Sequence, residues 1–278
     1  MGSALAARAV QAKFSVRGYD RDIDRNAAIR SEGGDPCTTA SEVLTASDWI
    51  VFSLMTTDQV RQSLEAHQEA LRPGQIIIDC STGEPDAMAS LGTKLKSLGV
   101  NYLDATIAGN SDETRRGEVL ALVGGEMETF EKCRPFFDSF TRESFHLGPN
   151  GYGARMKLVF NLVLGMHRAV LGEALGFADK LGIPSTQALK ILKKGTSYSK
   201  VMDNKGQKIL DQDFRPQAKL SQHLKDVNLM LQIGERYGAQ LPLSTEHQKL
   251  LSALNKAGCG ELDNSAIVKA FHSPQSQD

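Results

Sequence analysis

The sequence predicts an α/β domain with a doubly wound parallel sheet over residues 1–150, followed by an all-helical domain over residues 151–278. Short apolar runs alternate with helical segments in the first half, the strand pattern stops near residue 150, and a long apolar helix follows at once. The length of 278 residues also fits two domains of roughly 150 residues each. We therefore expect a long interdomain helix to join the two domains.

Five short apolar runs in the first half are typical of strands that are buried on both faces of a sheet. The runs are FSVRGYD (14–20), WIVFSLM (49–55), QIIIDCS (75–81), VNYLDAT (100–106) and VLALVGG (119–125). Residues 58–71 and 85–98, which lie between them, have helical spacing. Strand–helix alternation of this kind indicates a Rossmann-type fold.

The second half of the chain has the pattern of helices only. A mostly apolar helix is predicted over residues 154–181, where Gly182 ends it and Pro184 follows. Because such a helix needs cover all round, we expect neighbouring helices or a second subunit to bury it. Further helices are predicted over residues 185–194, 216–237, 244–257 and 263–271, and the tail SPQSQD is expected to fray.

Charge and composition exclude several classes of protein. The formal net charge of −1 leaves no basic footprint for nucleic acid or an anionic membrane, and no apolar run approaches the ~20 residues of a transmembrane helix. The four cysteines are scattered and the six histidines never lie three to five residues apart, so we expect no disulfide framework and no metal site. We expect a cytoplasmic protein, or an organellar one if its natural N-terminus lies upstream.

The first residues are unusual for a dinucleotide-binding domain. Such a domain opens with a strand, then G-x-G-x-x-G, then a helix whose N-terminus meets the pyrophosphate. Here Met1 and Gly2 lead directly into a predicted helix over residues 4–12, so Gly2 fits the last glycine of that fingerprint. Without the central first strand we expect a gap in the sheet, and we favour a natural start upstream over a defective product. Asp20, after the next strand, either holds the ribose hydroxyls of NAD or only begins a turn.

Four segments together resemble the β-hydroxyacid dehydrogenase family, the group of 3-hydroxyisobutyrate dehydrogenase. They are residues 1–21, IIIDCST (76–82), GYGARMKLVFN (151–161) and DFRPQAKLSQHLKD (213–226), and they cover nearly the whole chain in the family's order. The resemblance implies an oxidoreductase that transfers hydride between NAD or NADP and a small β-hydroxyacid or its semialdehyde. Glyoxylate and succinic semialdehyde stay open as substrates.

Lys157 is the catalytic candidate. The resemblance implies that this lysine protonates or deprotonates the substrate oxygen, a step that needs a cation beside a developing alkoxide. Asn161 lies four residues later, on the same helix face, and matches the family asparagine that holds the substrate carboxylate or hydroxyl. Phe160 departs from the family's pattern, which has a second asparagine there. The alternatives are a surface lysine and a helix–helix hydrogen bond.

The segment 104–110 resembles the loop that binds the substrate carboxylate in the family, through backbone N–H groups and a serine hydroxyl. Here Ala108 replaces the serine, Gly109 is retained, Asn110 replaces a second glycine and Thr106 replaces a proline. The backbone donors of Ala108, Gly109 and Asn110 are therefore the predicted substrate contacts, and an untypical hydroxyacid is a possible substrate.

The resemblance also implies cofactor contacts besides Gly2 and Asp20. Thr82 matches a contact to the nicotinamide half, Leu54 and Met55 border the cofactor, and Lys225 reaches it from the helical domain. The alternatives are plain strand ends and a solvated charge pair.

The choice between NAD and NADP rests on three side chains. Asp20 favours NAD, since a carboxylate repels a 2′-phosphate, whereas the flanking Arg17 and Arg21 could bind one. We expect NAD, with NADP as the alternative.

A second hypothesis places the chain in a different class, that of proteins without catalytic activity. A catalytically inactive paralogue that serves assembly or regulation is favoured by the missing strand, Ala108 and Phe160, and disfavoured by Lys157, Asn161 and Lys225. In either case the long apolar helix predicts a homodimer or homotetramer.

Overall fold

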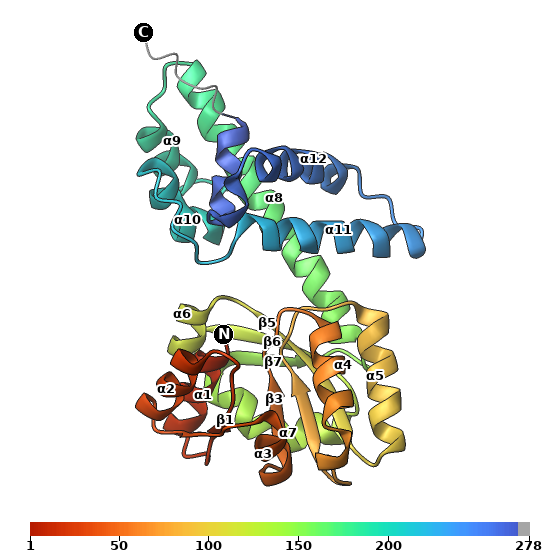
Figure 1. Cartoon of the computed structure of the whole chain (residues 1–278). Coiled ribbons are helices and arrows are strands. Elements are labelled where there is room, and N and C mark those ends of the chain that lie inside the picture. Colours follow the sequence, from red (N-terminus) through yellow and green to blue (C-terminus); the bar gives the residue numbers. More distant parts are fainter. Residues whose placement is uncertain (272–278) are drawn as a thin grey trace. The chain divides into compact units, whose positions relative to one another are not determined.

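The computed structural model describes residues 1–271 and divides the chain into two units, Met1–Lys157 and Leu158–Asp278 (Figure 1). The sequence-based boundary lies a few residues earlier, between residues 150 and 151. The tail SPQSQD lies outside the described residues.

Unit 1 contains two separate sheets. A two-stranded parallel sheet pairs β1 (Arg17–Gly18) with β2 (Asp35–Pro36), and a five-stranded sheet has the order β3-β4-β5-β6-β7. The strands of the larger sheet are β3 (Trp49–Phe52), β4 (Ile76–Asp79), β5 (Asn101–Ala108), β6 (Val119–Gly124) and β7 (Thr141–His146). The expected break in the sheet is present, with β3 as an edge strand. The short β2 and the polar β7 were not predicted, because neither has a run of apolar residues.

One pair of the larger sheet departs from the predicted parallel arrangement. β5 and β6 run antiparallel, whereas β3, β4 and β5 are parallel, as are β6 and β7. The connection between β5 and β6, residues 109–118, is shorter than the dozen or more residues that a parallel crossover needs. A connection of this length is too short for a parallel crossover, so β6 pairs with β5 in the antiparallel direction.

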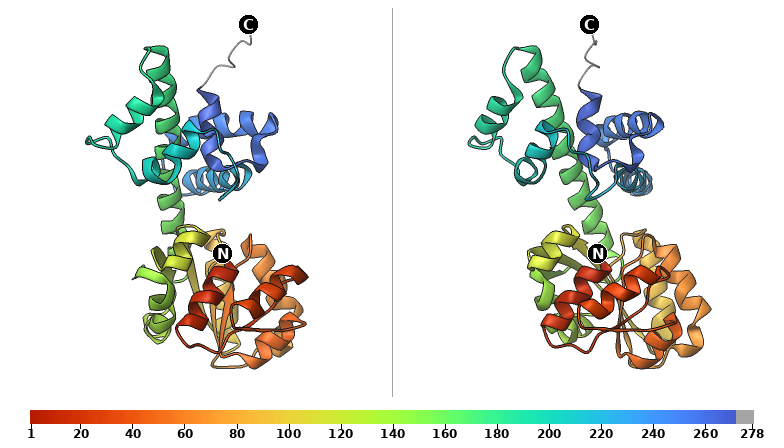
Figure 2. Two further views of the ribbon diagram at one scale, coloured as in Figure 1. Left: turned by 90° about the vertical axis from the view of Figure 1, so that its left-hand side faces the viewer. Right: turned by 60° about the vertical axis from the view of Figure 1, so that its left-hand side comes forward.

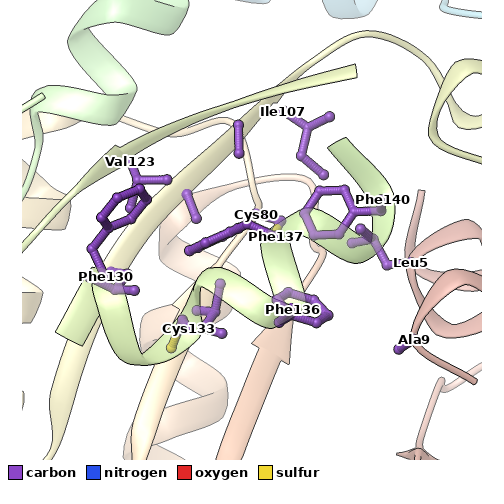
Figure 3. Close-up of a cluster of buried hydrophobic side chains, with 14 of the residues drawn as sticks. Leu5, Ala9, Cys80, Ile107, Val123, Phe130, Cys133, Phe136, Phe137 and Phe140 are labelled. Atoms are coloured by element: carbon purple, nitrogen blue, oxygen red, sulfur yellow. The ribbon is translucent and has the colours of Figure 1, made fainter. Parts of the chain in front are cut away.

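Helices cover both faces of the larger sheet (Figure 2). Side chains alternate along β4, so that Ile76 and Ile78 belong to one apolar cluster and Ile77 to the other. Figure 3 shows the first cluster, in which phenylalanines of α7 pack near Leu5 of α1. The helices of this unit are α1 (Gly2–Gln11), α2 (Ile23–Ser31), α3 (Ala40–Ala46), α4 (Thr57–Ala66), α5 (Pro85–Ser97), α6 (Ser111–Arg116), α7 (Met127–Phe140) and the 3-10 turn η1 (Gln68–Ala70).

Unit 2 is helical, as predicted, apart from one isolated bridge between Lys219 and Asp263 among its described residues. The helix α8 (Tyr152–Lys180) begins in unit 1 and continues into unit 2, and Gly182 follows it with a positive φ of 76°. The remaining elements are α9 (Ser185–Leu192), α10 (Lys200–Leu210), α11 (Leu220–Arg236), α12 (Pro242–Lys256), η2 (Cys259–Glu261) and η3 (Asn264–Ala270). The sequence did not predict α10, and it placed the start of α11 too early.

The composition of α8 corrects the expectation that no apolar segment approaches the length of a transmembrane helix. This helix is long and apolar enough, by length and composition alone, to cross a membrane, with a mean hydropathy of 1.4 over 18 residues. Of that window, 44% is buried, and Leu158, Leu171 and Leu175 belong to the apolar clusters of unit 2. Packing against α11 and η3 thus accounts for part of its apolar character, as in other helices that form a core.

Candidate active site

Lys157 lies in the second turn of α8 and is buried, with 8% of its surface exposed. Its Nζ donates a hydrogen bond of 2.7 Å to the carbonyl oxygen of Ile107, next to the last residue of β5. The hydrogen bond holds the amino group of Lys157 beside the end of β5, where the loop beginning at Gly109 follows Ala108. The structure therefore brings together two of the predicted elements of the site, the catalytic candidate and the segment 108–110.

A buried carboxylate in β5 holds the start of α8. Asp104 is fully buried, and its two oxygens accept the N–H groups of Gly151 (2.7 Å) and Ala154 (2.9 Å). Gly153 has no room for a side chain, because a Cβ there would lie 2.4 Å from the Leu122 carbonyl oxygen. The first turn of α8, and with it Lys157, is thereby attached to the sheet.

Burial raises the pKa of Asp104 to about 6, although the N–H groups of Gly151 and Ala154 favour its charged form. Asp104 was not among the residues predicted to act in the site. The available signal was an acid in the middle of an apolar run, since a buried carboxylate needs partners.

The loop after β5 offers fewer free backbone donors than predicted. Ala108 ends the strand and is buried, and a Cβ at Gly109 would lie 2.3 Å from Cγ1 of Val119. Asn110 caps α6, where its Oδ1 accepts the N–H of Glu113 and its own N–H donates to Glu113 Oε2. In this conformation the N–H of Asn110 is already bonded. The contact of residues 108–110 with substrate stays a prediction.

Asn161 lies one turn after Lys157 on α8 and is buried in unit 2. Its Nδ2 donates a hydrogen bond of 3.1 Å to Oδ2 of Asp226, a buried residue of α11. Because a carboxylate only accepts hydrogen bonds, this contact fixes the orientation of the amide, with Oδ1 turned away from Asp226. Asp226 was not among the predicted site residues, although it directly follows Lys225 in the sequence.

Other polar side chains of unit 2 are also buried, one on α8 itself and two on the helices α11 and α12. Arg168 is buried, and burial lowers the pKa of its guanidinium to about 10, opposed by the charges of Asp263 and Asp226. The rings of His223 and His247 lie 5.2 Å apart, and both reach the backbone of α8 where Gly165 lacks a side chain. Burial, together with the charge of Arg168, lowers the pKa of His247 to about 4. At neutral pH the histidine is therefore neutral and the arginine is charged.

The contact of Lys225 with Asp226 is longer than that of Asn161 with the same carboxylate. Its Nζ lies 3.9 Å from Oδ1 of Asp226, and 41% of its side chain is exposed. Its predicted contact with the cofactor stays a prediction.

Gly2 and Asp20, two predicted cofactor residues of unit 1, lie at the surface. Gly2 begins α1, and a Cβ there would lie in ordinary contact with Ser53, the residue after β3. The carboxylate of Asp20 is 41% exposed, accepts the N–H of Asp22 at 3.0 Å and lies 3.7 Å from Arg25. An exposed helix N-terminus and an exposed carboxylate after β1 fit the phosphates and the ribose of a dinucleotide.

The loops after β3 and β4 are linked to each other. The N–H of Leu54 donates to Oγ of Ser81 at 3.0 Å, and the N–H of Met55 donates to Gln59 Oε1. Thr82 is half-buried beside them. Both loops follow the carboxyl ends of parallel strands, where ligands bind in open α/β sheets.

A buried acid also supports the second of these loops. Asp79, at the end of β4, accepts hydrogen bonds from the N–H of Ser81 and the hydroxyl of Tyr102. Burial raises the pKa of this carboxyl to about 6 in spite of these donors.

Within residues 1–271, no group of three or more His, Cys, Asp or Glu side chains is arranged to hold a metal.

Comparison with known proteins decides the family. Residues 1–148 match the NAD binding domain of 6-phosphogluconate dehydrogenase, and residues 151–271 match the NAD-binding domain of NADP-dependent 3-hydroxyisobutyrate dehydrogenase. The chain belongs to the β-hydroxyacid dehydrogenase family. The predicted class of enzyme, an oxidoreductase acting on CH–OH groups, and the predicted cofactor, NAD or NADP, are thereby confirmed. The predicted fold class, a Rossmann-type domain followed by a helical domain, is also confirmed, apart from the antiparallel pair of β5 and β6.

Individual relatives span most of the chain. A 2-hydroxy-3-oxopropionate reductase of Escherichia coli is 30% identical over 87% of this chain and 84% of its own length. The crystal structure of a 3-hydroxyisobutyrate dehydrogenase from Salmonella typhimurium has a TM-score of 0.89 and 25% identity, over 96% of this chain and 95% of that one. The cytokine-like nuclear factor N-PAC of Xenopus tropicalis is 26% identical over 98% of this chain, which spans about half (51%) of that relative's length.

Proposed function

We propose that this β-hydroxyacid dehydrogenase interconverts a small β-hydroxyacid of the 3-hydroxyisobutyrate class and the corresponding semialdehyde, with Lys157 as the acid/base. The observation that carries the proposal is the buried ammonium group of Lys157, hydrogen-bonded to Ile107 at the end of β5. The names of the relatives from Escherichia coli and Salmonella typhimurium support the substrate class.

Each residue has a proton-handling or orienting role in this proposal. The nicotinamide cofactor, when bound, accepts or supplies the hydride. Lys157 gives a proton to the substrate oxygen in the reductive direction and takes it back in the oxidative one, and its hydrogen bond to Ile107 keeps the Nζ in one position. Asn161, oriented by Asp226, presents its Oδ1 as an acceptor for the substrate hydroxyl.

For the cofactor, we propose NAD rather than NADP. The support is the exposed carboxylate of Asp20, which would repel a 2′-phosphate. Arg17 has a contact of 3.5 Å with the Ala46 carbonyl oxygen, so one of the two flanking arginines has a partner inside the chain. Titration with NADH and NADPH, followed by the fluorescence of Trp49, tests this choice: tighter binding of NADPH would contradict it.

The acid/base role is tested by Lys157→Ala, with the exposed Lys132→Ala as the matched control. We expect kcat to fall by about 10²–10⁴-fold in the Lys157 variant, because general acid–base catalysis contributes that much. NADH affinity and thermal stability should stay close to those of the wild type and of the control. A Lys157 variant that turns over within a few-fold of the wild type would remove this residue from the mechanism.

A second candidate function is a non-catalytic role in assembly or regulation. The similarity to a relative named as a nuclear factor, and the engaged N–H of Asn110, favour it. The same NADH titration, followed by a panel of hydroxyacids and semialdehydes, separates the two functions. Saturable cofactor binding without turnover of any compound would support the non-catalytic role.

We also propose a homo-oligomer formed through α8. Four large apolar side chains of unit 2 are exposed at helical spacing on this helix: Val159, Val163, Val170 and Phe177. A second copy of the chain is the partner that the symmetry of most oligomers favours. Light scattering should show a dimer or tetramer, and Val170→Glu with Phe177→Glu should lower the mass to that of the monomer.

For the compartment, we propose the cytoplasm. Its support is that all four cysteines, Cys37, Cys80, Cys133 and Cys259, are free thiols. Microscopy of the tagged full-length protein tests this.

A further inference from the structure

The first residue of α4 packs against the loop that follows β4. Thr57 is 5% exposed, and its hydroxyl is buried without a hydrogen-bond partner among residues 1–271. A Cβ at Gly83 would lie only 1.7 Å from Oγ1 of Thr57. The hydrogen that glycine carries in place of a Cβ therefore points at the hydroxyl oxygen, and a Cα–H group is a weak donor to oxygen.

Steric contact, rather than backbone conformation, explains glycine at position 83. Gly83 is not among the glycines with a positive φ, so its backbone would accept an alanine without strain. The space that a methyl group needs is filled by Oγ1 of Thr57 and, at 3.2 Å, by Cε of Met88. The absence of a side chain thus allows the loop to approach α4 closely.

Thr82 lies between two contacts that attach this loop to its neighbours. Before it, Oγ of Ser81 accepts the N–H of Leu54 at 3.0 Å. After it, Gly83 packs on Thr57. Thr82 itself is half-buried at the carboxyl end of a parallel strand, where ligands bind in open α/β sheets. Its backbone is therefore held from both sides.

We propose that Thr57 is a positioning residue for the nicotinamide half of the cofactor, because it holds Gly83 and through it Thr82. The proposal rests on the proposed function, in which the cofactor is bound for hydride transfer, and on the predicted contact of Thr82 with it. The predicted contacts with the other half, Gly2 and Asp20, belong to different segments of the chain. Loss of the Thr57 contact should therefore affect the two halves of the cofactor unequally.

The test inserts a methyl group by Gly83→Ala and removes the obstructing hydroxyl again in the double variant Thr57→Ala with Gly83→Ala. In the double variant the remaining neighbours, Cβ of residue 57 at 3.0 Å and Cε of Met88 at 3.2 Å, have to give by only a few tenths of an ångström. Gly195→Ala is the matched control, because a Cβ there meets nothing closer than 3.6 Å. Calorimetric titration with NADH is compared with titration with ADP-ribose, which lacks the nicotinamide ring.

We expect Gly83→Ala to weaken NADH binding by about tenfold or more, with ADP-ribose affinity within about twofold of the wild type. The double variant should return to within about threefold of the wild-type affinity for NADH, and Gly195→Ala should not differ from the wild type. A loss of the same size for both ligands would indicate general damage to unit 1 and overturn the proposal. Unchanged NADH binding in Gly83→Ala, or no recovery in the double variant, would overturn it as well.

Two variants of Thr57 keep the proposal testable if Gly83→Ala does not fold. Thr57→Ser retains the hydroxyl that faces Gly83, whereas Thr57→Val retains the shape of the side chain and loses its oxygen. We expect Thr57→Ser to bind NADH like the wild type and Thr57→Val to bind it about threefold or more weakly. Equal affinities of these two variants would contradict the proposal.

Failure of the proposed function gives a different result, namely a wild type that binds no dinucleotide. Hydrogen exchange at the N–H of Thr82 then decides the positioning by Thr57 separately. Faster exchange in Gly83→Ala and Thr57→Val than in the wild type and Gly195→Ala supports it, and equal exchange in all four proteins contradicts it.

Discussion

Replacement of Asp104 by asparagine should change how the stability of unit 1 depends on pH. In the folded chain, burial raises the pKa of this carboxyl from 3.8 to about 6. Below about pH 4 the folded and unfolded chains both hold the proton, so the group contributes no difference. As the pH rises from about 4 to about 6, the unfolded chain releases its proton first, and the free energy of unfolding falls.

The size of the effect follows from the shift in pKa. At 1.36 kcal/mol per pKa unit, the shift corresponds to a loss of about 3 kcal/mol for the wild type between pH 4 and pH 7. Asparagine cannot ionise, so Asp104→Asn lacks this loss. Asp79, whose pKa burial also raises to about 6, contributes the same kind of loss to both proteins, and its negative charge is one of the causes that raise the pKa of Asp104. The variant should therefore gain about 3 kcal/mol relative to the wild type over this range.

Urea denaturation at several pH values between 4 and 7 measures the difference. The only tryptophan, Trp49, lies in β3 and reports on unit 1. The exposed Asp138→Asn is the matched control, and its difference from the wild type should stay flat. A difference between Asp104→Asn and the wild type that does not vary with pH would refute the reasoning. Hydrogen exchange at Gly151 and Ala154 adds a local readout, because the amide of the variant can accept from only one of their N–H groups.

Two further predictions concern unit 2. The lowered pKa of His247 means that folding keeps the ring neutral, so stability is full above about pH 6.5 and about 3 kcal/mol is lost as the pH falls to about 4. His247→Asn should remove this acid sensitivity in thermal melts followed by circular dichroism, whereas the exposed His167→Asn should keep it; identical melts for both variants would contradict the assignment. For Asp226→Ala we expect kcat/KM to fall by about tenfold, because Asn161 loses the acceptor that orients it, with partial recovery in Asp226→Asn. Equal loss in both variants would show that the charge of Asp226, rather than its acceptor oxygen, is what matters.

The local pattern of residue types was sufficient to predict many of the strands and helices. The strands β3, β4, β5 and β6 lie inside the predicted apolar runs or within two residues of them, because a strand buried on both faces needs consecutive apolar residues. The start and end of α8 followed from its flanking glycines. Elements without such a pattern were missed: β7 has charged and polar residues, and α10 begins in a polar stretch.

The capping box at the start of α6 is a feature of the site that the sequence contains but that was not among the predictions. Asn110 and Glu113 have the three-residue spacing of a capping box, a local signal for the start of a helix. That signal already implies that the N–H of Asn110 has a partner.

The sequence by itself determined the family, the two-part architecture and the identity of Lys157 as the catalytic candidate, because these depend on residue types at fixed spacings along the chain. Only the tertiary structure showed that Asp104 holds the start of α8, across 47 and 50 residues of chain, and that Asp226 orients Asn161 across 65 residues. The physical reason is that a buried carboxylate is stabilised by whichever donors the fold brings to it, and sequence spacing does not identify partners at that separation.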